Sequence, residues 1–386
     1  GKILISWFRG LKSLVYVDFS GCTALEEHSF DGCSSLEQVS LPSCSDIGNY
    51  AFYYCSSLSS VYLPSASILR SHTFRHSGLT EIELDSLTRT KANFNECYSF
   101  ADCTNLKYIS IPQLAIITTY MFRGCPSLKE IYAPSCSSIL TNAFKDCNSI
   151  DSITFGLLEV EFSSIPYPSM IKNIDFPSAT AIDLTSLSKL YNLVSCKLGS
   201  VTEISDYTFQ DFAQLTELEL PSVIQIGKDA FQNCAKLTSI SLRNLKIVDS
   251  TSPGLFSGCK LLSTIFMPES PPQTFHKDTF KGLKCKIKIP IESSSVYDDD
   301  ISIEGDKKGD GYWCGIPLTT QKISVKINDD ENTYTGEQLS DCISKAGISE
   351  SLIKSLIIEN GILNVQDFVS SINVYPSLEN LKITNL

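Results

Sequence analysis

The chain has 386 residues, of which 42% are apolar and 19% are charged. It is too long for a small disulfide scaffold, and its composition excludes an intrinsically disordered chain. No 18-residue stretch lacks polar side chains, so the sequence predicts no membrane-spanning helix. Acidic residues outnumber basic ones by 43 to 31, which gives a net charge of −12. Because no Lys/Arg cluster could neutralise a run of phosphates, we expect no nucleic-acid partner.

An internal repeat of about 22 residues extends from residue 8 to about residue 290. Repeats of this length are typical of solenoids, in which each copy forms one coil. The step of 26 residues before Phe100 indicates a four-residue insertion near Thr88–Asn95. Each copy contains one apolar residue, usually phenylalanine, that marks the repeat register, and we call this residue the anchor. The thirteen anchors, eleven of them phenylalanine, are Phe8, Phe30, Phe52, Phe74, Phe100, Phe122, Phe144, Ile165, Leu187, Phe209, Phe231, Phe256 and Phe280.

Counted from the anchor, apolar residues stand at +6, +9, +11 and +17, and proline often stands at +12. Polar residues at +8 and +10 alternate with the apolar ones, which is the pattern of a half-buried strand. Proline ends that strand because it has no N–H to donate to the neighbouring coil. The remaining residues are too few for a full helix, so we expect a return arm of short strands or 3₁₀ turns.

One copy cannot bury its Phe, Leu and Ile side chains alone, so the coils must stack about 4.8 Å apart into a parallel sheet. The sequence therefore predicts a leucine-rich-repeat β-solenoid over residues 1–291. We expect it to be right-handed and curved, with about 13 coils and few or no helices.

The +8 and +10 side chains should form two columns on the outer face of the strands. We call this surface the strand face. Tyrosine is frequent there, and tyrosine is enriched at protein interfaces. The alternative is that these rings only brace the sheet. The candidate ligand-binding residues, which combine phenol rings and carboxylates on four successive coils, are Tyr62, Glu81, Glu83, Tyr108, Glu130 and Tyr132.

Cysteine recurs at position +3 of the repeat. Other copies have Leu11 or Phe212 there, which can replace a small buried hydrophobe but not half of a disulfide. We therefore predict that these cysteines are free, buried thiols stacked from coil to coil as a ladder. A second, smaller ladder of cysteines is predicted at position +14. Disulfides are a weaker interpretation, and so is zinc, because no C-x₂₋₄-C pair occurs. The cysteines at +3 are Cys33, Cys55, Cys103, Cys125, Cys147, Cys234 and Cys259, and those at +14 are Cys22, Cys44 and Cys136.

The sequence offers little support for catalysis. His72 and His76 have the spacing of two metal ligands on a helix, but they flank an anchor in a predicted turn. The carboxylate pairs Glu81/Glu83 and Glu217/Glu219 could in principle hydrolyse a glycoside, but such pairs on a solenoid strand usually belong to a solvated face. We therefore expect no enzyme activity, no catalytic residues, no metal site and no cofactor.

After residue 291 the repeat stops. Residues 292–320 are predicted to be a polar connecting loop, whose carboxylates lack the spacing of a calcium loop. Residues 321–386 are predicted to form a small α/β module with strands at 323–327, 353–358 and 378–383. Its helices are expected at 336–346, started by Thr335, and at 365–372. The last two strands are 25 residues apart, as in two longer leucine-rich-repeat coils.

The final strand has no polar cap, which a solenoid normally requires. We therefore expect either a homodimer through that strand or a longer parent protein. The first residues, Gly1–Ile5, have neither the apolar core nor the cleavage site of a signal peptide, so we expect that any export signal was removed or was never there.

The repeat F-x-x-C-x-x-L-x-x-[IV]-x-L-P, clear from Phe30 to Phe52, resembles the BspA-like leucine-rich repeat family over residues 8–290. The resemblance implies a secreted or surface-anchored protein, mostly from gut and oral bacteria, that adheres to host matrix or to other cells. It supplies no catalytic residue. We therefore expect a non-enzymatic extracellular or cell-surface protein whose partner is a protein on a host or neighbouring cell. The carboxylates of the strand face would favour a basic partner. The alternative is a carbohydrate-binding or nutrient-capture surface protein.

Overall fold

The computed structural model describes residues 2–91, 96–160, 165–249, 251, 254–274, 279–280, 283 and 285–289. It also describes strands at 312–313, 316–320, 323–327, 334–336, 355–359 and 380–384. The chain forms two compact units, residues 1–238 with 256–261 and residues 239–255 with 262–386. Each unit is described by itself.

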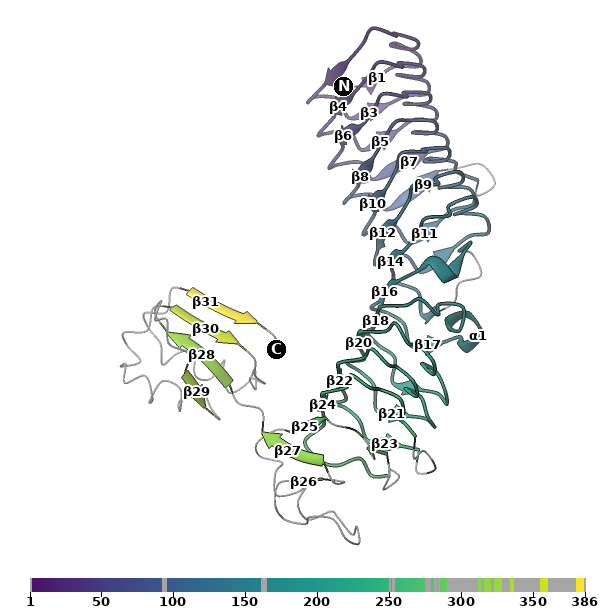
Figure 1. The fold of residues 1–386 in the computed structure, drawn as a ribbon. Coiled ribbons are helices and arrows are strands. Elements are labelled where there is room, and N and C mark those ends of the chain that lie inside the picture. The colour runs from purple at the N-terminus through teal and green to yellow at the C-terminus, as the bar shows by residue number, and fades with distance from the viewer. Residues whose placement is uncertain are drawn as a thin grey trace. The chain divides into compact units, whose positions relative to one another are not determined.

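The first unit contains a stack of parallel strands, one per coil (Figure 1). Neighbouring strands pair at equivalent repeat positions, so that Val39 faces Val61 and Ile109 faces Ile131. They form sheets of three (β2, β4, β6) and seven strands (β8 to β20). The strands are β2 (Tyr16–Asp18), β4 (Gln38–Ser40), β6 (Ser60–Tyr62), β8 (Glu81–Glu83), β10 (Tyr108–Ser110), β12 (Glu130–Ala133), β14 (Ser152–Phe155), β16 (Asn173–Phe176), β18 (Ser195–Leu198) and β20 (Glu217–Glu219).

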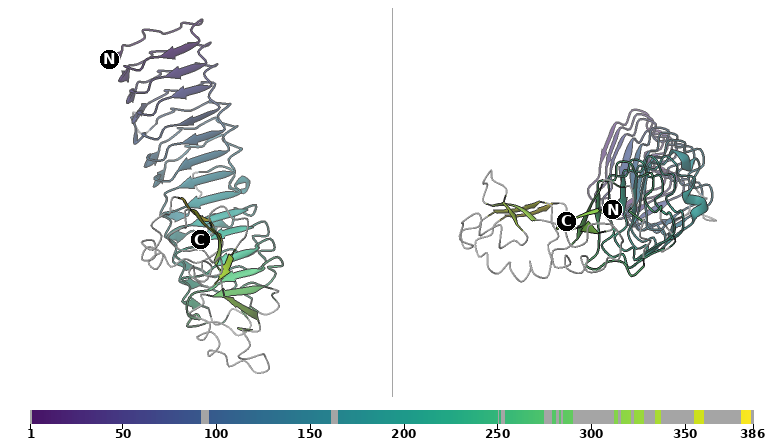
Figure 2. Two further views of the ribbon diagram at one scale, coloured as in Figure 1. Left: turned by 90° about the vertical axis from the view of Figure 1, so that its left-hand side faces the viewer. Right: turned by 60° about the horizontal axis from the view of Figure 1, so that its bottom comes forward.

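The return arm of most coils carries a second, shorter strand, as the +17 position predicts. Figure 2 shows both strand columns of this unit stacked as ladders. The helical elements of the unit are short: η2 (Pro168–Met170) and α1 (Leu184–Leu187), whose cap Asp183 accepts from the N–H groups of Thr185 and Ser186. The return strands are β1 (Lys2–Ile3), β3 (Ala24–Leu25), β5 (Asp46–Ile47), β7 (Ile68–Arg70), β9 (Arg89–Lys91), β11 (Ile116–Ile117), β13 (Ser138–Ile139), β15 (Glu159–Val160), β17 (Ala181–Ile182), β19 (Glu203–Ile204) and β21 (Gln225–Ile226). The predicted solenoid with few helices is confirmed.

The anchor phenylalanines stack inside the coils as predicted. Phe30 and Phe52 are fully buried, with ring centroids 5.4 Å apart and planes 1° from parallel. The same stacking continues to Phe144, where the last pair, Phe122 and Phe144, is 5.3 Å apart. Offset stacked rings of this kind add to the burial of their large apolar surface. The phenylalanine column is thus the central support of the core.

The chain turns sharply on both sides of most anchors. At the anchor phenylalanines from Phe8 to Phe144, the residues at −2 and +2 have positive φ, a backbone conformation that non-glycine residues rarely adopt. In this conformation the turn donates to the next coil: the N–H groups of Tyr50, Phe52 and Tyr54 bond to carbonyl oxygens of the following coil at 2.8–3.1 Å. We call the surface formed by the side chains at −2, +1 and +2 the turn edge.

The second unit contains β22 (Ser239–Ser241), β24 (Thr264–Phe266), β25 (Lys286–Ile289) and β27 (Ile316–Thr320), which pair in parallel in that order. It also contains β23 (Ile247–Val248) and β26 (Tyr312–Trp313), which is antiparallel to β27. A four-stranded sheet comprises β29 (Tyr334–Gly336), β28 (Ile323–Ile327), β30 (Ser355–Glu359) and β31 (Asn380–Thr384) in that order. β30 and β31 are parallel, with Leu356 facing Leu381, as their 25-residue spacing predicts.

Two details of the carboxy-terminal prediction differ from the structure. The segment predicted as a connecting loop contains β26 and β27, because the apolar residues of β27 extend the sheet of β25. Thr335 and Gly336, predicted to start a helix, lie in β29, where Thr335 faces Ser324 of β28. The rest of that helix and the helix at 365–372 lie outside the described residues. None of the helices in the described part of the chain is long and apolar enough to cross a membrane.

Candidate functional site

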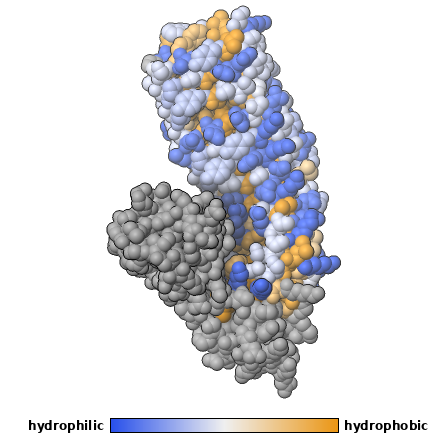
Figure 3. All heavy atoms as spheres, turned by 60° about the vertical axis from the view of Figure 1, so that its left-hand side comes forward, coloured by the Kyte–Doolittle hydropathy of each residue, from blue (hydrophilic) through white to orange (hydrophobic). Residues whose placement is uncertain are grey.

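The structure places five of the six candidate residues on three adjacent strands, β8, β10 and β12. Tyr108 in β10 faces Glu81 on one side and Glu130 on the other. Ser110, two residues later in β10, faces Glu83 and Tyr132 in the same way. The remaining candidate, Tyr62, ends β6 in the preceding coil. Figure 3 turns this side of the molecule forward and shows hydrophobic atoms as a narrow strip among hydrophilic side chains.

The candidate side chains are accessible. Tyr62 is 59% exposed and Tyr132 is 41% exposed, the three glutamates are exposed, and Tyr108 is half-buried. Burial raises the pKa of Tyr108, as do the nearby charges of Glu83 and Glu130, while a hydrogen bond with Ser110 lowers it. The phenol of Tyr108 therefore lies within the electrostatic reach of two carboxylates. We call Tyr62, Glu81, Glu83, Tyr108, Glu130 and Tyr132 the tyrosine–glutamate patch.

Farther along the strand face, carboxylates have polar partners on the adjacent strand. Lys197 in β18 forms an ion pair with Glu219 in β20, with Nζ and Oε1 2.7 Å apart. Ser195 donates to Glu217 at 3.2 Å. The Lys197–Glu219 pair neutralises two charges, whereas the four strands of the tyrosine–glutamate patch carry no lysine or arginine. This contrast separates the patch from the rest of the face.

The turn edge carries an aromatic column that the sequence prediction missed. Successive ring centroids are 4.8, 4.6, 4.9 and 5.0 Å apart, and successive planes lie within 25° of parallel. Each ring stands two residues before an anchor, so the same 22-residue register could have revealed the column. Its members are His28, Tyr50, His72, Tyr98 and Tyr120.

Further aromatic and charged side chains flank this column. Tyr53 lies edge-on to Tyr54 at 4.5 Å, and Tyr54 stacks on His76 at 4.4 Å. Arg75 forms an ion pair with Asp102, with Nη2 and Oδ2 2.9 Å apart, and its guanidinium lies 5.4 Å from the centre of the Tyr98 ring. Cation–π contacts of this type stabilise the ring and the charge together.

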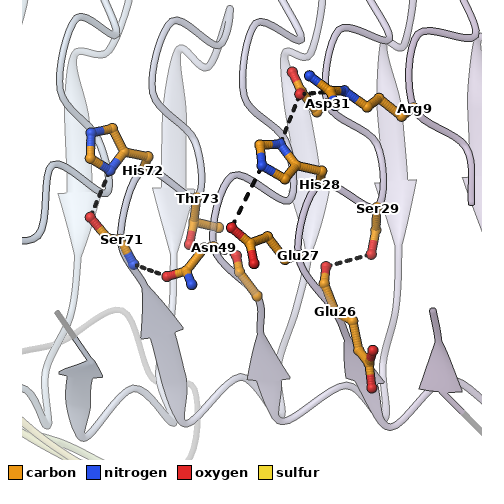
Figure 4. Close-up of polar contacts among 11 residues, drawn as sticks. Arg9, Glu26, Glu27, His28, Ser29, Asp31, Asn49, Ser71, His72 and Thr73 are labelled. Atoms are coloured by element: carbon orange, nitrogen blue, oxygen red, sulfur yellow. Dashed lines mark hydrogen bonds and ion pairs between the residues drawn. The ribbon is translucent and has the colours of Figure 1, made fainter. Parts of the chain in front are cut away.

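At the amino-terminal end of the turn edge a polar network joins two coils (Figure 4). Asp31 Oδ2 lies 3.0 Å from Arg9 Nε and 2.8 Å from His28 Nδ1. The second ring nitrogen of His28 lies 3.6 Å from a carboxylate oxygen of Glu27. Asp31 is itself buried, so its charge is held by these two partners.

The two histidines weighed as metal ligands have other contacts. His72 Nδ1 lies 2.7 Å from Ser71 Oγ, and burial beside Arg75 and His76 lowers the pKa of His72 to about 4. His76 stacks on Tyr54, and its Nε2 lies 3.6 Å from Asp102. Within the described residues, no group of three or more His, Cys, Asp or Glu side chains could hold a metal ion.

The cysteines at +3 lie in the core. All seven are buried and free, and each thiol donates to the carbonyl oxygen of the preceding anchor at 3.0–3.2 Å. Burial raises the pKa of Cys103 to about 11 and raises that of Cys55 further. The predicted burial of this ladder is confirmed, and the thiols are structural.

A family model of the BspA type leucine rich repeat region matches the chain in six copies, over residues 2–98, 96–194 and 180–299. The chain belongs to this family. BspA-type repeat proteins are typically surface-exposed or secreted bacterial proteins, and leucine-rich repeat arrays are typically non-enzymatic scaffolds that bind proteins. None of the curated proteins compared with this BspA-type chain matches it.

Several solved structures resemble the BspA-type chain. A leucine-rich repeat protein from Bacteroides ovatus is 21% identical, with 83% of this chain and 87% of that one covered and a TM-score of 0.33. A leucine rich cell surface protein from Faecalibacterium prausnitzii is 20% identical, with 69% of both chains covered and a TM-score of 0.30. An internalin from Listeria monocytogenes is 13% identical, with coverages of 75% and 78% and a TM-score of 0.47.

Proposed function

We propose that this protein is a non-enzymatic extracellular or cell-surface adhesin that binds a protein on a host or neighbouring cell through the tyrosine–glutamate patch. The observation that carries the proposal is the placement of Tyr108 between Glu81 and Glu130, with Tyr132 one strand away. Membership of the BspA-type family supports the adhesive role and the location.

The chemistry of the patch suits a protein partner. Tyrosine brings a large contact area at low entropic cost, and its hydroxyl can bond a partner's main chain. The carboxylates of Glu81, Glu83 and Glu130 favour a basic partner. Because these charges are exposed, they should act mainly on the association rate, and salt should screen them over the ~10 Å Debye length reached near 0.1 M.

A binding panel tests this proposal. Immobilised matrix proteins and a glycan array are exposed to the same sample, and the best protein partner is then measured by surface plasmon resonance. Tyr108→Ala with Tyr132→Ala should weaken binding at least about tenfold, as expected for two interface tyrosines. The matched control is Tyr16→Ala, which removes an exposed strand-face tyrosine three coils away from β8.

Two outcomes would contradict the proposal. If the double variant binds like the wild type, the patch is not the binding site. If it binds weakly but also melts several degrees lower, the tyrosines brace the sheet. Glu81→Gln with Glu83→Gln should reduce the salt dependence of the association rate, and an unchanged salt dependence would contradict a basic partner.

A further inference from the structure

On the turn edge, one face of the Tyr54 ring lies toward positions that hold glycine. In the +2 column Tyr54 is followed by His76 in the next coil but preceded by Gly32 and Gly10. His76 covers one face of Tyr54, with the two planes 13° apart, and Tyr53 stands nearly perpendicular beside it. The other face of Tyr54 points toward the coil in which glycine replaces a side chain. Tyr54 accordingly remains 49% exposed.

The two glycines leave open space beside this face. A Cβ atom at Gly32 would meet only the Cα of Gly10, at 3.8 Å, and a Cβ atom at Gly10 would meet nothing within 4 Å. Elsewhere in the column side chains fill this layer: Asp102 reaches over Gly124, and Asn233 reaches over Gly258. One missing side-chain layer corresponds to the coil spacing of about 4.8 Å, which is close to the 4.4 Å between the stacked rings of Tyr54 and His76.

Polar groups border the open layer. The +1 column beside it holds Arg9 and Asp31, joined by the 3.0 Å ion pair. The side chain of Arg9 is 57% exposed, so its guanidinium has N–H donors beyond the one that bonds Asp31. The layer therefore combines a flat apolar face on one side with charged hydrogen-bonding groups on another.

We propose that Tyr54, Gly32 and Arg9 form a binding site for a pyranose ring of a glycan. The axial C–H groups of a pyranose carry slight positive charge and fit the negative face of a phenol ring. Its hydroxyl groups lie around the rim of the ring, where Arg9 can donate. A nucleotide base could also stack here, but its phosphates would be repelled by a chain of net charge −12.

Saturation-transfer difference NMR on the intact protein tests this site. The probes are the methyl pyranosides of glucose, galactose, mannose, N-acetylglucosamine and glucuronic acid. At least one should receive saturation at its ring protons, and Tyr54→Ala should weaken its binding about tenfold, the effect of losing one aromatic platform. The matched control is Tyr207→Ala, which removes a turn-edge tyrosine that is 43% exposed and has Lys228 over its ring.

A second variant fills the layer and leaves Tyr54 in place. Gly32→Asn should be tolerated because Asn233 occupies the same column with φ 61°, close to the φ of 73° at Gly32. It should abolish sugar binding with little change in melting temperature, and if it fails to fold, Tyr54→Ala decides alone. The site is wrong if no probe receives saturation, or if Tyr54→Ala binds like the wild type. Because the strand-face double variant should retain sugar binding, failure of this site and failure of the adhesin proposal are distinguishable.

Discussion

The thiol of Cys55 donates a hydrogen bond to the main-chain carbonyl oxygen of Phe30, with Sγ and O 3.1 Å apart. The same oxygen accepts from the N–H of Cys33 within its own coil, so both of its lone pairs are used. Cysteine is small enough for the core and still has a donor, which leucine at the same position lacks. The bond therefore joins consecutive coils where the anchors stack.

Removal of one such thiol should weaken the array modestly. Cys125→Ala loses a bond to Phe100 and leaves a small cavity, so we expect it to lower the free energy of unfolding by about 1–2 kcal/mol. Cys125→Val refills most of the volume without restoring the donor, so the difference between the two variants isolates the hydrogen bond. Urea unfolding measures both. Equal stability of Cys125→Val and the wild type would show that the thiol acts only as a filler.

The thiols should be unreactive until the protein unfolds. Thiolate is the reactive form, and burial raises the pKa of Cys44 to about 12 and that of Cys285 to about 11. Titration with a thiol reagent should therefore be slow in the native protein. After unfolding without reductant, all thirteen cysteines that are free and buried in the described residues should react. A much lower number would mean that the protein contains disulfides.

One ion pair should make the array sensitive to acid. Arg70 donates from Nε and Nη2 to the two carboxylate oxygens of Asp46, at 2.9 and 2.7 Å, and these bonds hold the pKa of Asp46 below its usual 3.8. The stabilisation is therefore present above pH 3.8 and is lost as the pH falls through the lowered pKa. Both side chains are partly exposed, so we expect at most about 1 kcal/mol.

Asp46→Asn should accordingly reduce stability at pH 7 and flatten the loss of stability below pH 5. Melting temperatures across this range measure the effect, with the exposed Glu37→Gln as the control. A pH profile of Asp46→Asn parallel to that of the wild type would contradict the assignment.

The sequence was sufficient to predict the core and the strand register. A 22-residue period in phenylalanine fixes which side chains stack, and alternation at +8 to +11 fixes which ones face out, so Phe52 and Tyr132 lie where expected. The thiol–carbonyl bonds were not predictable, because they depend on the path of the main chain around the anchor. The aromatic column of the turn edge was missed because His28 and Tyr50 stand in a turn with positive φ, where the alternation of a strand no longer tells which way a side chain points.

Protonation of His72 should destabilise the turn edge. Its pKa is lowered from 6.5 to about 4, chiefly by burial, so the folded protein binds fewer protons than the unfolded chain between these values. This contribution to stability is present above pH 6.5 and is lost as the pH falls toward 4. His72→Tyr places in this column the residue found at Tyr50 and Tyr98, and it should lose fewer degrees of melting temperature between pH 7 and pH 4. A profile that matches the wild type would show that His72 does not control the response.

Because the phenylalanines stack coil on coil, the effect of replacing one of them should be largest in the adjacent coils. Each coil contacts only its neighbours, so loss of one anchor affects the two adjacent interfaces most strongly. Phe52 is fully buried between Phe30 and Phe74, and Phe52→Ala should cost about 3–5 kcal/mol. Phe8 is only half-buried at the end of the column, so Phe8→Ala should cost clearly less and serves as the matched control.

Hydrogen exchange can locate the damage. The N–H of Phe30 bonds to Ala51 and that of Phe52 bonds to Thr73, so both amides cross the interfaces that Phe52→Ala weakens. They should exchange faster in this variant, while the N–H of Phe209, which bonds to Ala230 several coils away, should stay protected. Equal acceleration of all three amides would mean that the unit opens only as a whole, and the nearest-neighbour account of its stability would be wrong.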